Sequence, residues 1–171
     1  MDNTKTPAAL EAAELTLQVT DATKDYVVLR VWPKVEAVHK RLATMGYTCR
    51  HYCCRNVIYC GVGTGGERYR DACAITAYRV AGDAGQDECD SSFLAAAAKW
   101  GVGDAVLRVP GIRLGSDKVQ INPVPSPDGK SIRGYTLGER LAVEAVTYEG
   151  GEVSALQIAK ADGGKLVWQR H

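Results

Sequence analysis

The chain has 171 residues, 46% of them hydrophobic and 24% charged, which is enough for a folded domain with a buried core. Its 21 Lys and Arg nearly balance its 20 Asp and Glu, and a net charge of +1 excludes binding to nucleic acid or membranes by bulk charge. No apolar run approaches the roughly 20 residues of a membrane span, and the N-terminus does not resemble a secretory signal. We therefore expect an intracellular, cytoplasmic protein without a membrane partner, in which any basic surface is local.

The N-terminal third is expected to hold an arm, a strand and a helix. Residues 1–25 show no clear period and are interpreted as the arm, and residues 26–32 form a short apolar run. Pro33 suits the first turn of a helix, and apolar side chains recur at helical spacing after it. This pattern predicts an amphipathic helix over 33–45 that ends at Gly46.

The next segment predicts three strands. Runs rich in Tyr, Cys, Val and Ile cover 47–54 and 56–62, with a bend near Arg55 and Asn56. A third, imperfectly alternating run covers 68–80.

A second helix is expected after these strands. An Ala-rich run predicts it over 90–101, with Asp90 or Ser91 as its N-cap and Gly101 and Gly103 at its end.

The C-terminal part reads as a loop followed by a β-meander. Three prolines mark residues 122–134 as a loop, and residues 135–171 hold three strand-like runs, 141–148, 152–160 and 165–169, separated by Gly-Gly turns.

The predicted fold class is α+β. A core domain over 26–121 has a three-stranded antiparallel sheet packed by the two helices, and the β-meander packs on or next to this core.

A glycine-rich motif, Gly61 to Gly66, satisfies the G-x-G-x-x-G pattern of dinucleotide-binding loops, and Asp83 lies at a suitable distance for a ribose contact. That interpretation requires a helix directly after the glycines. A helix there would leave Ile75 and Tyr78 on its polar side, so a glycine-rich hairpin is favoured.

The six cysteines raise the question of a metal or redox site. Cys49, His51 and Cys53 would share one face of a strand, leaving Cys54 on the other. A fourth ligand would have to come from Cys60, Cys73 or Cys89. We favour reduced thiols that act as small buried apolar residues, and we expect no metal and no cofactor.

Nucleophilic catalysis would need a Cys or Ser beside a histidine and an acid. The three histidines are His39, His51 and His171, and no local catalytic signature surrounds them. We therefore expect a protein that is not an enzyme.

Basic and aromatic residues interleave along the three predicted strands, which is typical of a sheet that binds single-stranded nucleic acid. An ordinary solvated sheet face explains the same composition. The residues are Tyr47, Arg50, His51, Tyr52, Arg55, Tyr59, Arg68, Tyr69, Arg70, Tyr78 and Arg79.

The segment from Asp90 to Pro110 resembles the core helix of the Rad fifty-two family of single-strand annealing proteins, particularly its phage and bacterial members. It has the acid, Phe93, a small-residue helix, the turn Trp100-Gly-Val-Gly103 and the later proline. The order of a helix, three strands and a helix is also similar to that family's core.

The resemblance implies ATP-independent binding of single-stranded DNA and annealing of complementary strands by a homo-oligomer. Phosphate contacts are then expected from Arg50, Arg55, Arg68, Arg70 and Lys99, and base stacking from Tyr52 or Tyr69.

One departure from the family pattern leaves an alternative open. Family members usually carry a Lys-Arg pair just after the phenylalanine, where this chain has Leu94 and Ala95. The alternative is a non-enzymatic assembly or regulatory protein on the same scaffold, with weak or lost DNA binding. A metal- or nucleotide-binding enzyme is a third, weaker possibility.

Overall fold

The computed structural model describes residues 7–65 and 69–170. The chain divides into two compact units. The first, here the helical unit, comprises Met1–Leu10 and Pro33–Leu107, and the second, here the β unit, comprises Glu11–Trp32 and Arg108–His171. These boundaries differ from the expected ones, because residues of the predicted N-terminal arm belong to the β unit.

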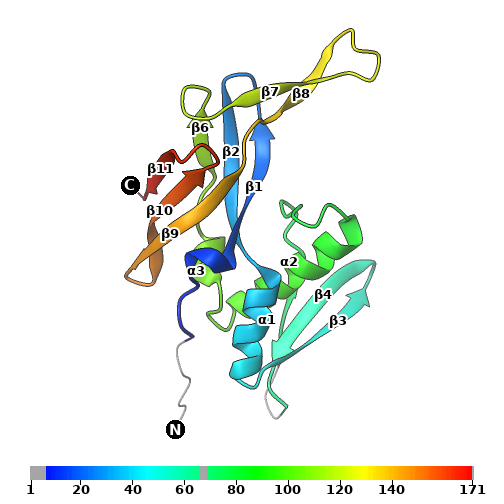
Figure 1. Cartoon of the computed structure of the whole chain (residues 1–171). Coiled ribbons are helices and arrows are strands. Elements are labelled where there is room, and N and C mark those ends of the chain that lie inside the picture. Colours follow the sequence, from blue (N-terminus) through cyan, green and yellow to red (C-terminus); the bar gives the residue numbers. More distant parts are fainter. Residues whose placement is uncertain (1–6, 66–68, 171) are drawn as a thin grey trace. The chain divides into compact units, whose positions relative to one another are not determined.

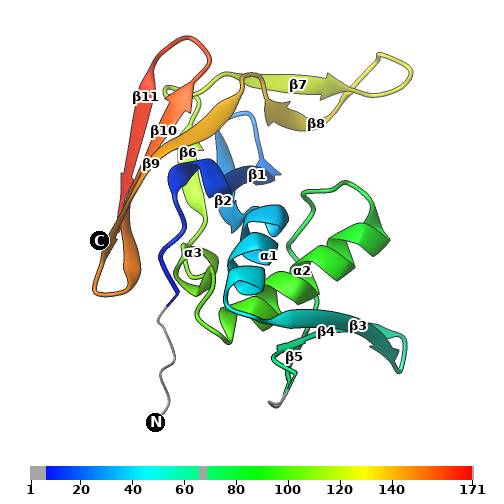
Figure 2. The same ribbon diagram turned by 60° about the horizontal axis from the view of Figure 1, so that its bottom comes forward.

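The helical unit contains the predicted helix, three strands and second helix in that order. The elements are α1 (Val35–Thr44), β3 (Thr48–Cys54), β4 (Val57–Gly63), β5 (Arg70–Cys73), α2 (Ala84–Ala98) and α3 (Asp104–Leu107). The strands form one antiparallel sheet in the order β3-β4-β5, in which β3 and β4 are labelled in Figure 1 and β5 in Figure 2.

Helix α2 is the centre of this unit, with α1 packed on one side and β4 and β5 on the other (Figure 2). Phe93 is buried and stacks on the ring of His39 from α1, with the ring centroids 3.8 Å apart. On the sheet, Cys60 and Val62 are fully buried. The small residues Ala96 and Ala97 are also fully buried, which allows close approach of the neighbouring elements.

The start of α2 differs from the prediction. The helix begins at Ala84 rather than at residue 90, and its N-cap is Asp83, whose carboxylate accepts the Gln86 N–H at 2.9 Å. The two residues expected as caps lie inside the helix. Asp90 accepts a hydrogen bond from the Gln86 side chain at 2.6 Å, and Ser91 Oγ accepts one from the Ile75 N–H.

The third strand is shorter than predicted, because the chain after Cys73 folds onto α2. The Ile75 N–H donates to Ser91 Oγ at 3.0 Å, and the Ala81 N–H donates to Asp87 Oδ1 at 2.9 Å. Tyr78, between these two anchors, is buried, and burial followed by the charges of nearby acids raises its pKa to about 12. Residues 74–83 are therefore a strap held by α2.

The β unit contains three small sheets. The elements of the unit are η1 (Ala12–Glu14), β1 (Leu15–Ala22), β2 (Tyr26–Pro33), β6 (Ile112–Gly115), β7 (Ile121–Pro125), β8 (Ile132–Leu137), β9 (Leu141–Glu149), β10 (Glu152–Lys160) and β11 (Lys165–Gln169). The sheets are β1-β2-β6, β9-β10-β11 and the hairpin β7-β8, so the predicted C-terminal meander is confirmed.

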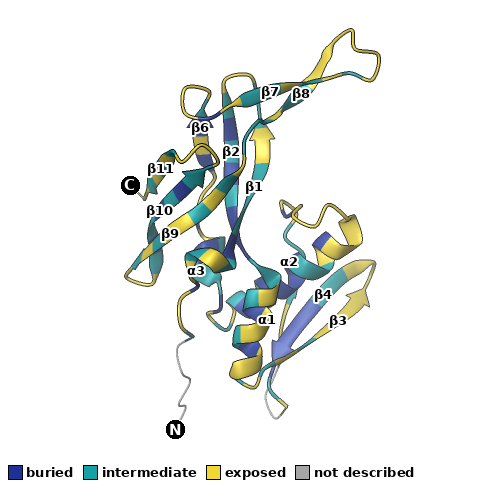
Figure 3. Ribbon diagram, in the orientation of Figure 1, coloured by how far each residue is buried: buried dark blue, intermediate teal, exposed yellow. Residues whose placement is uncertain are grey.

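Two expectations for this unit are wrong. Residues 15–22 of the predicted arm form strand β1, and much of the predicted loop over 122–134 belongs to the β7-β8 hairpin. Pro123 and Pro125 lie in β7 of a two-stranded sheet, where a missing N–H is tolerated on the unpaired side. The core of the unit is apolar and comes from β2, β6 and β10, as the dark blue segments of Figure 3 show.

None of the helices in the described part of the chain is both long enough and apolar enough to cross a bilayer.

A pH effect arises at the contact between α1 and α2. Burial, followed by repulsion from His51 on β3, lowers the pKa of His39, while Asp90 on α2 opposes the shift. Folded His39 thus binds protons less readily than unfolded His39, and its contribution to stability is lost as the pH falls below about 6.5. We expect the melting temperature of His39→Gln to decrease less between pH 7 and pH 5 than that of the wild type. Thermal melts across this range test the prediction, which fails if both proteins show the same decrease.

Candidate nucleic-acid interface

The register of the helical unit's sheet assigns each side chain to one of two faces. His51 lies opposite Cys60 and Cys49 opposite Val62, and the buried Cys60 and Val62 face α2. Side chains alternate along a strand, so their sequence neighbours lie on the opposite face. This outer face consists of Thr48, Arg50, Tyr52, Cys54, Val57, Tyr59, Gly61, Gly63, Tyr69, Asp71 and Cys73.

Two tyrosines form a stacked pair on the outer face. Tyr52 and Tyr59 are directly opposite each other on β3 and β4, with ring centroids 5.5 Å apart and an interplanar angle of 12°. Tyr52 is 39% exposed. The turn that sets this register is the predicted bend at Arg55 and Asn56, with φ of 51° and 62°, as a two-residue hairpin requires. Tyr59 is half-buried, so Tyr52 is the more accessible ring of the pair.

Arg50 lies one row along the sheet from the tyrosine pair. Its guanidinium carbon is 4.2 Å from the ring centroid of Tyr69, a cation–π contact that leaves the side chain exposed. The Tyr69 hydroxyl is 2.8 Å from Thr48 Oγ1. Arg50, Tyr52 and Tyr69 are thus three predicted site residues that the structure brings to one face.

The two glycines of β4 explain why this arrangement fits. A Cβ at Gly63 would lie 3.0 Å from the backbone Cα of Tyr69, and one at Gly61 would lie 2.3 Å from Asp71 Oδ1. Glycine at both positions lets the Tyr69 ring and the Asp71 side chain lie on the strand.

Two other predicted residues, Arg70 and Lys99, make their contacts between β5 and the C-terminal end of α2. The Arg70 guanidinium lies 3.8 Å from the Trp100 ring centroid and donates to the Lys99 carbonyl at the end of α2. The Lys99 ammonium donates to the Asp71 backbone carbonyl. Both cations therefore tie β5 to the C-terminus of α2 and are not grouped with Arg50. Their prediction as phosphate ligands remains untested.

Arg55 is exposed in the hairpin turn, at the end of the sheet next to Cys54. Arg68 lies outside the described residues.

Two residues of the outer face, Tyr59 and Asp71, are not among the site residues predicted from the sequence. Tyr59 belongs to the basic and aromatic pattern but not to the predicted site, although its pairing with Tyr52 makes the stack. Asp71 is absent from the sequence prediction of the site, and its carboxylate lies near Arg50 over Gly61. The two-residue alternation of Tyr69, Asp71 and Cys73 was the available signal.

The described part of the glycine motif lies in and next to a strand of an antiparallel pair, as the favoured hairpin interpretation requires. Gly61 and Gly63 lie in β4, which pairs with β5 in antiparallel orientation, and Asp83 caps α2. The element after the motif is thus a strand, and the dinucleotide interpretation fails.

The cysteines follow the predicted alternation but not the predicted burial. Cys60 is buried, whereas Cys53, Cys54 and Cys73 are exposed, so their interpretation as buried apolar residues is wrong. All six are free thiols. Within residues 7–65 and 69–170, no group of three or more His, Cys, Asp and Glu side chains is arranged to hold a metal ion.

The histidines have structural partners. His51 Nε2 lies 3.0 Å from the Cys89 carbonyl oxygen, and His39 stacks on Phe93. His171 is outside the described residues.

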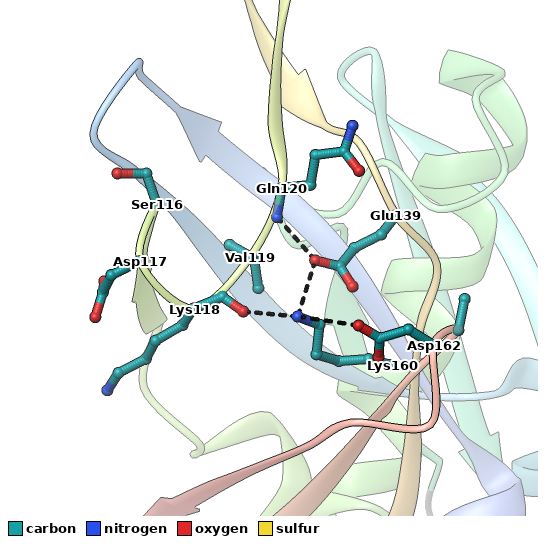
Figure 4. A pocket seen from close by; sticks show the side chains of 9 residues that line it. Ser116, Asp117, Lys118, Val119, Gln120, Glu139, Lys160 and Asp162 are labelled. Atoms are coloured by element: carbon teal, nitrogen blue, oxygen red, sulfur yellow. Dashed lines mark hydrogen bonds and ion pairs between the residues drawn. The ribbon is translucent and has the colours of Figure 1, made fainter.

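The β unit holds a cleft of about 410 Å³ (Figure 4). At its centre, the Lys160 ammonium contacts the Lys118 carbonyl oxygen at 3.0 Å, Glu139 Oε1 at 3.5 Å and Asp162 Oδ2 at 3.8 Å. Glu139 Oε1 also accepts the Gln120 N–H at 2.8 Å. These contacts join three loops, which makes Lys160 a structural residue of this unit.

Comparison with known proteins assigns no family: no family model, curated protein or solved structure matches the chain.

Proposed function

We propose that the protein binds single-stranded DNA through the outer face of the β3-β4-β5 sheet and anneals complementary strands without ATP. The observation that carries this proposal is the exposed Tyr52, stacked on the half-buried Tyr59 and lying beside the exposed Arg50. Aromatic rings accept bases by stacking, and a neighbouring guanidinium binds the phosphates between them.

The homo-oligomeric annealing part of the proposal depends on the resemblance to the Rad fifty-two family. The order α1, β3, β4, β5, α2 is the order that the resemblance implies. Gly101 and Gly103 both have positive φ, 81° and 78°, which suits the sharp turn expected after the core helix.

A second candidate is an assembly or regulatory protein without DNA affinity. It is favoured by Leu94, which occupies a basic position of the family pattern and is 1% exposed, so this position lies in the core. The acid Asp71 on the outer face also favours this candidate, because a carboxylate repels phosphate.

Fluorescence anisotropy of a labelled single strand, titrated at two or more salt concentrations, tests the proposal. We expect Tyr52→Leu to weaken binding by about 5- to 100-fold, the effect of losing one stacked base. We expect Arg50→Gln to reduce the slope of log affinity against log salt by about 0.7.

Matched controls lie on β8 of the β unit, where Arg133 is exposed and Tyr135 is half-buried. Arg133→Gln and Tyr135→Leu should leave binding unchanged. Equal losses in the control and site variants would contradict the assignment of the face. A folded wild-type protein that does not bind at low salt would favour the second candidate.

A further inference from the structure

The outer face carries one acidic side chain among its described residues, and a general phosphate-binding surface gives no reason for it. Asp71 lies on β5, directly opposite Gly61 of β4. Its Oδ1 occupies the space over Gly61 that a Cβ would fill, and Arg50 Nε approaches the same point from the other side. The carboxylate therefore lies on the strand surface in the row next to the tyrosine stack.

The position of Asp71 is also defined relative to Tyr52. Asp71 belongs to the row of Arg50 and Gly61, which adjoins the row of Tyr52 and Tyr59, so it lies diagonally across β4 from Tyr52. Burial, followed by the charge of Asp71 and a hydrogen bond to its carboxylate, raises the pKa of the Tyr52 hydroxyl. A base stacked on Tyr52 would therefore lie near Asp71, the acidic side chain of the adjacent row.

We propose that Asp71 reads the Watson–Crick edge of an unpaired guanine stacked on the Tyr52–Tyr59 pair. This inference rests on the proposed function and specifies its preferred substrate. Guanine presents two adjacent donors on that edge, N1–H and the N2 amino group, which match the two oxygens of a carboxylate. Arg50, beside the carboxylate, is placed to bind the backbone of the same strand.

The other bases make a poorer match with a carboxylate. Adenine and cytosine each offer one amino group flanked by an acceptor nitrogen, and thymine offers one N–H between two carbonyls. The expected order of affinity therefore places guanine first.

The contact is also specific for unpaired strands. Guanine uses N1–H and its N2 amino group to pair with cytosine, so Asp71 and a complementary strand compete for the same edge. Pairing would therefore release the base from this contact.

Binding of three 5′-labelled oligonucleotides tests the inference. The first is all thymidine, the second carries isolated guanines between thymidines, and the third carries inosine at the same positions. Isolated guanines in a lithium buffer avoid quadruplexes, and inosine lacks only the N2 amino group. We expect the wild type to bind the guanine strand about 5- to 100-fold more tightly than the thymidine strand, with inosine between them.

Asp71→Asn should abolish this preference and strengthen binding to the thymidine strand, because a negative charge is removed from the face. Glu88→Gln is the matched control, since Glu88 is exposed on α2 of the same unit, and should keep the wild-type order. Equal affinity of the wild type for all three strands, or a guanine preference that survives Asp71→Asn, overturns the inference and leaves the proposed function intact. Absence of binding to any strand by the folded wild type overturns both.

Discussion

Replacing Leu94 by lysine is expected to destabilise the helical unit by at least about 3 kcal/mol without creating a DNA-binding site. Leu94 is 1% exposed on α2. The substitution removes a buried apolar side chain, which alone costs about 2–5 kcal/mol, and places an ammonium where no water can solvate it. In a protein of ordinary stability, such a loss removes a large part of the free energy of unfolding.

Chemical denaturation measures this loss of stability, and two further variants serve as controls. Leu94→Met conserves volume and should cost less than about 1.5 kcal/mol. Ala95→Lys, at the half-buried neighbouring position, should cost less than Leu94→Lys. A stable Leu94→Lys protein with increased affinity for single-stranded DNA would contradict the buried position of this side chain.

The second large effect is expected for Asp87→Ala, at about 2–3 kcal/mol. Asp87 is 1% exposed, and its Oδ1 accepts the Ala81 N–H of the strap over residues 74–83. Alanine would remove the acceptor of this part-buried hydrogen bond and would leave the space of a buried carboxylate unfilled. Hydrogen exchange should become faster at Ala81 and along the strap.

Asp87→Asn separates the hydrogen bond from the charge. The amide oxygen can keep the Ala81 contact, and Asp87 Oδ2 has no hydrogen-bond partner that replacement by an amide would remove. We therefore expect Asn to cost much less than Ala. Glu88→Ala, the exposed neighbour, should change stability by less than about 0.5 kcal/mol. Equal effects of Asp87→Ala and Glu88→Ala would contradict the role of Asp87 as the anchor of the strap.

Local patterns predicted much of the helical unit. Helical spacing located α1, and the turn at Arg55-Asn56 set the register that places Arg50 and Tyr52 together. The Gly-Gly turns at 150–151 and 163–164 located the C-terminal meander. In each case neighbouring residues alone decide the structure.

The missed features depend on contacts between distant residues. Strand β1 alternates Leu15, Leu17 and Val19 over a short stretch, but its pairing with β2 makes it a strand. The end of β5 is set by Ser91 and Asp87, which lie on the following helix. The placement of Arg50 and Arg70 on opposite faces of the sheet likewise depends on the pairing of β3, β4 and β5. The residue types alone do not distinguish these two arginines.

The pairing of β2 with β6 has a consequence for biosynthesis. Leu29 meets Ile112 across this pair, and the whole of Pro33–Leu107 lies between them in the chain. On the ribosome, β2 emerges early and lacks this neighbour until the intervening segment has been translated. At a synthesis rate of about 5–20 residues per second, this wait lasts several seconds, longer than a small helical segment needs to fold. The segment that carries α1, the β3-β4-β5 sheet and α2 can thus fold before the strands on either side of it meet.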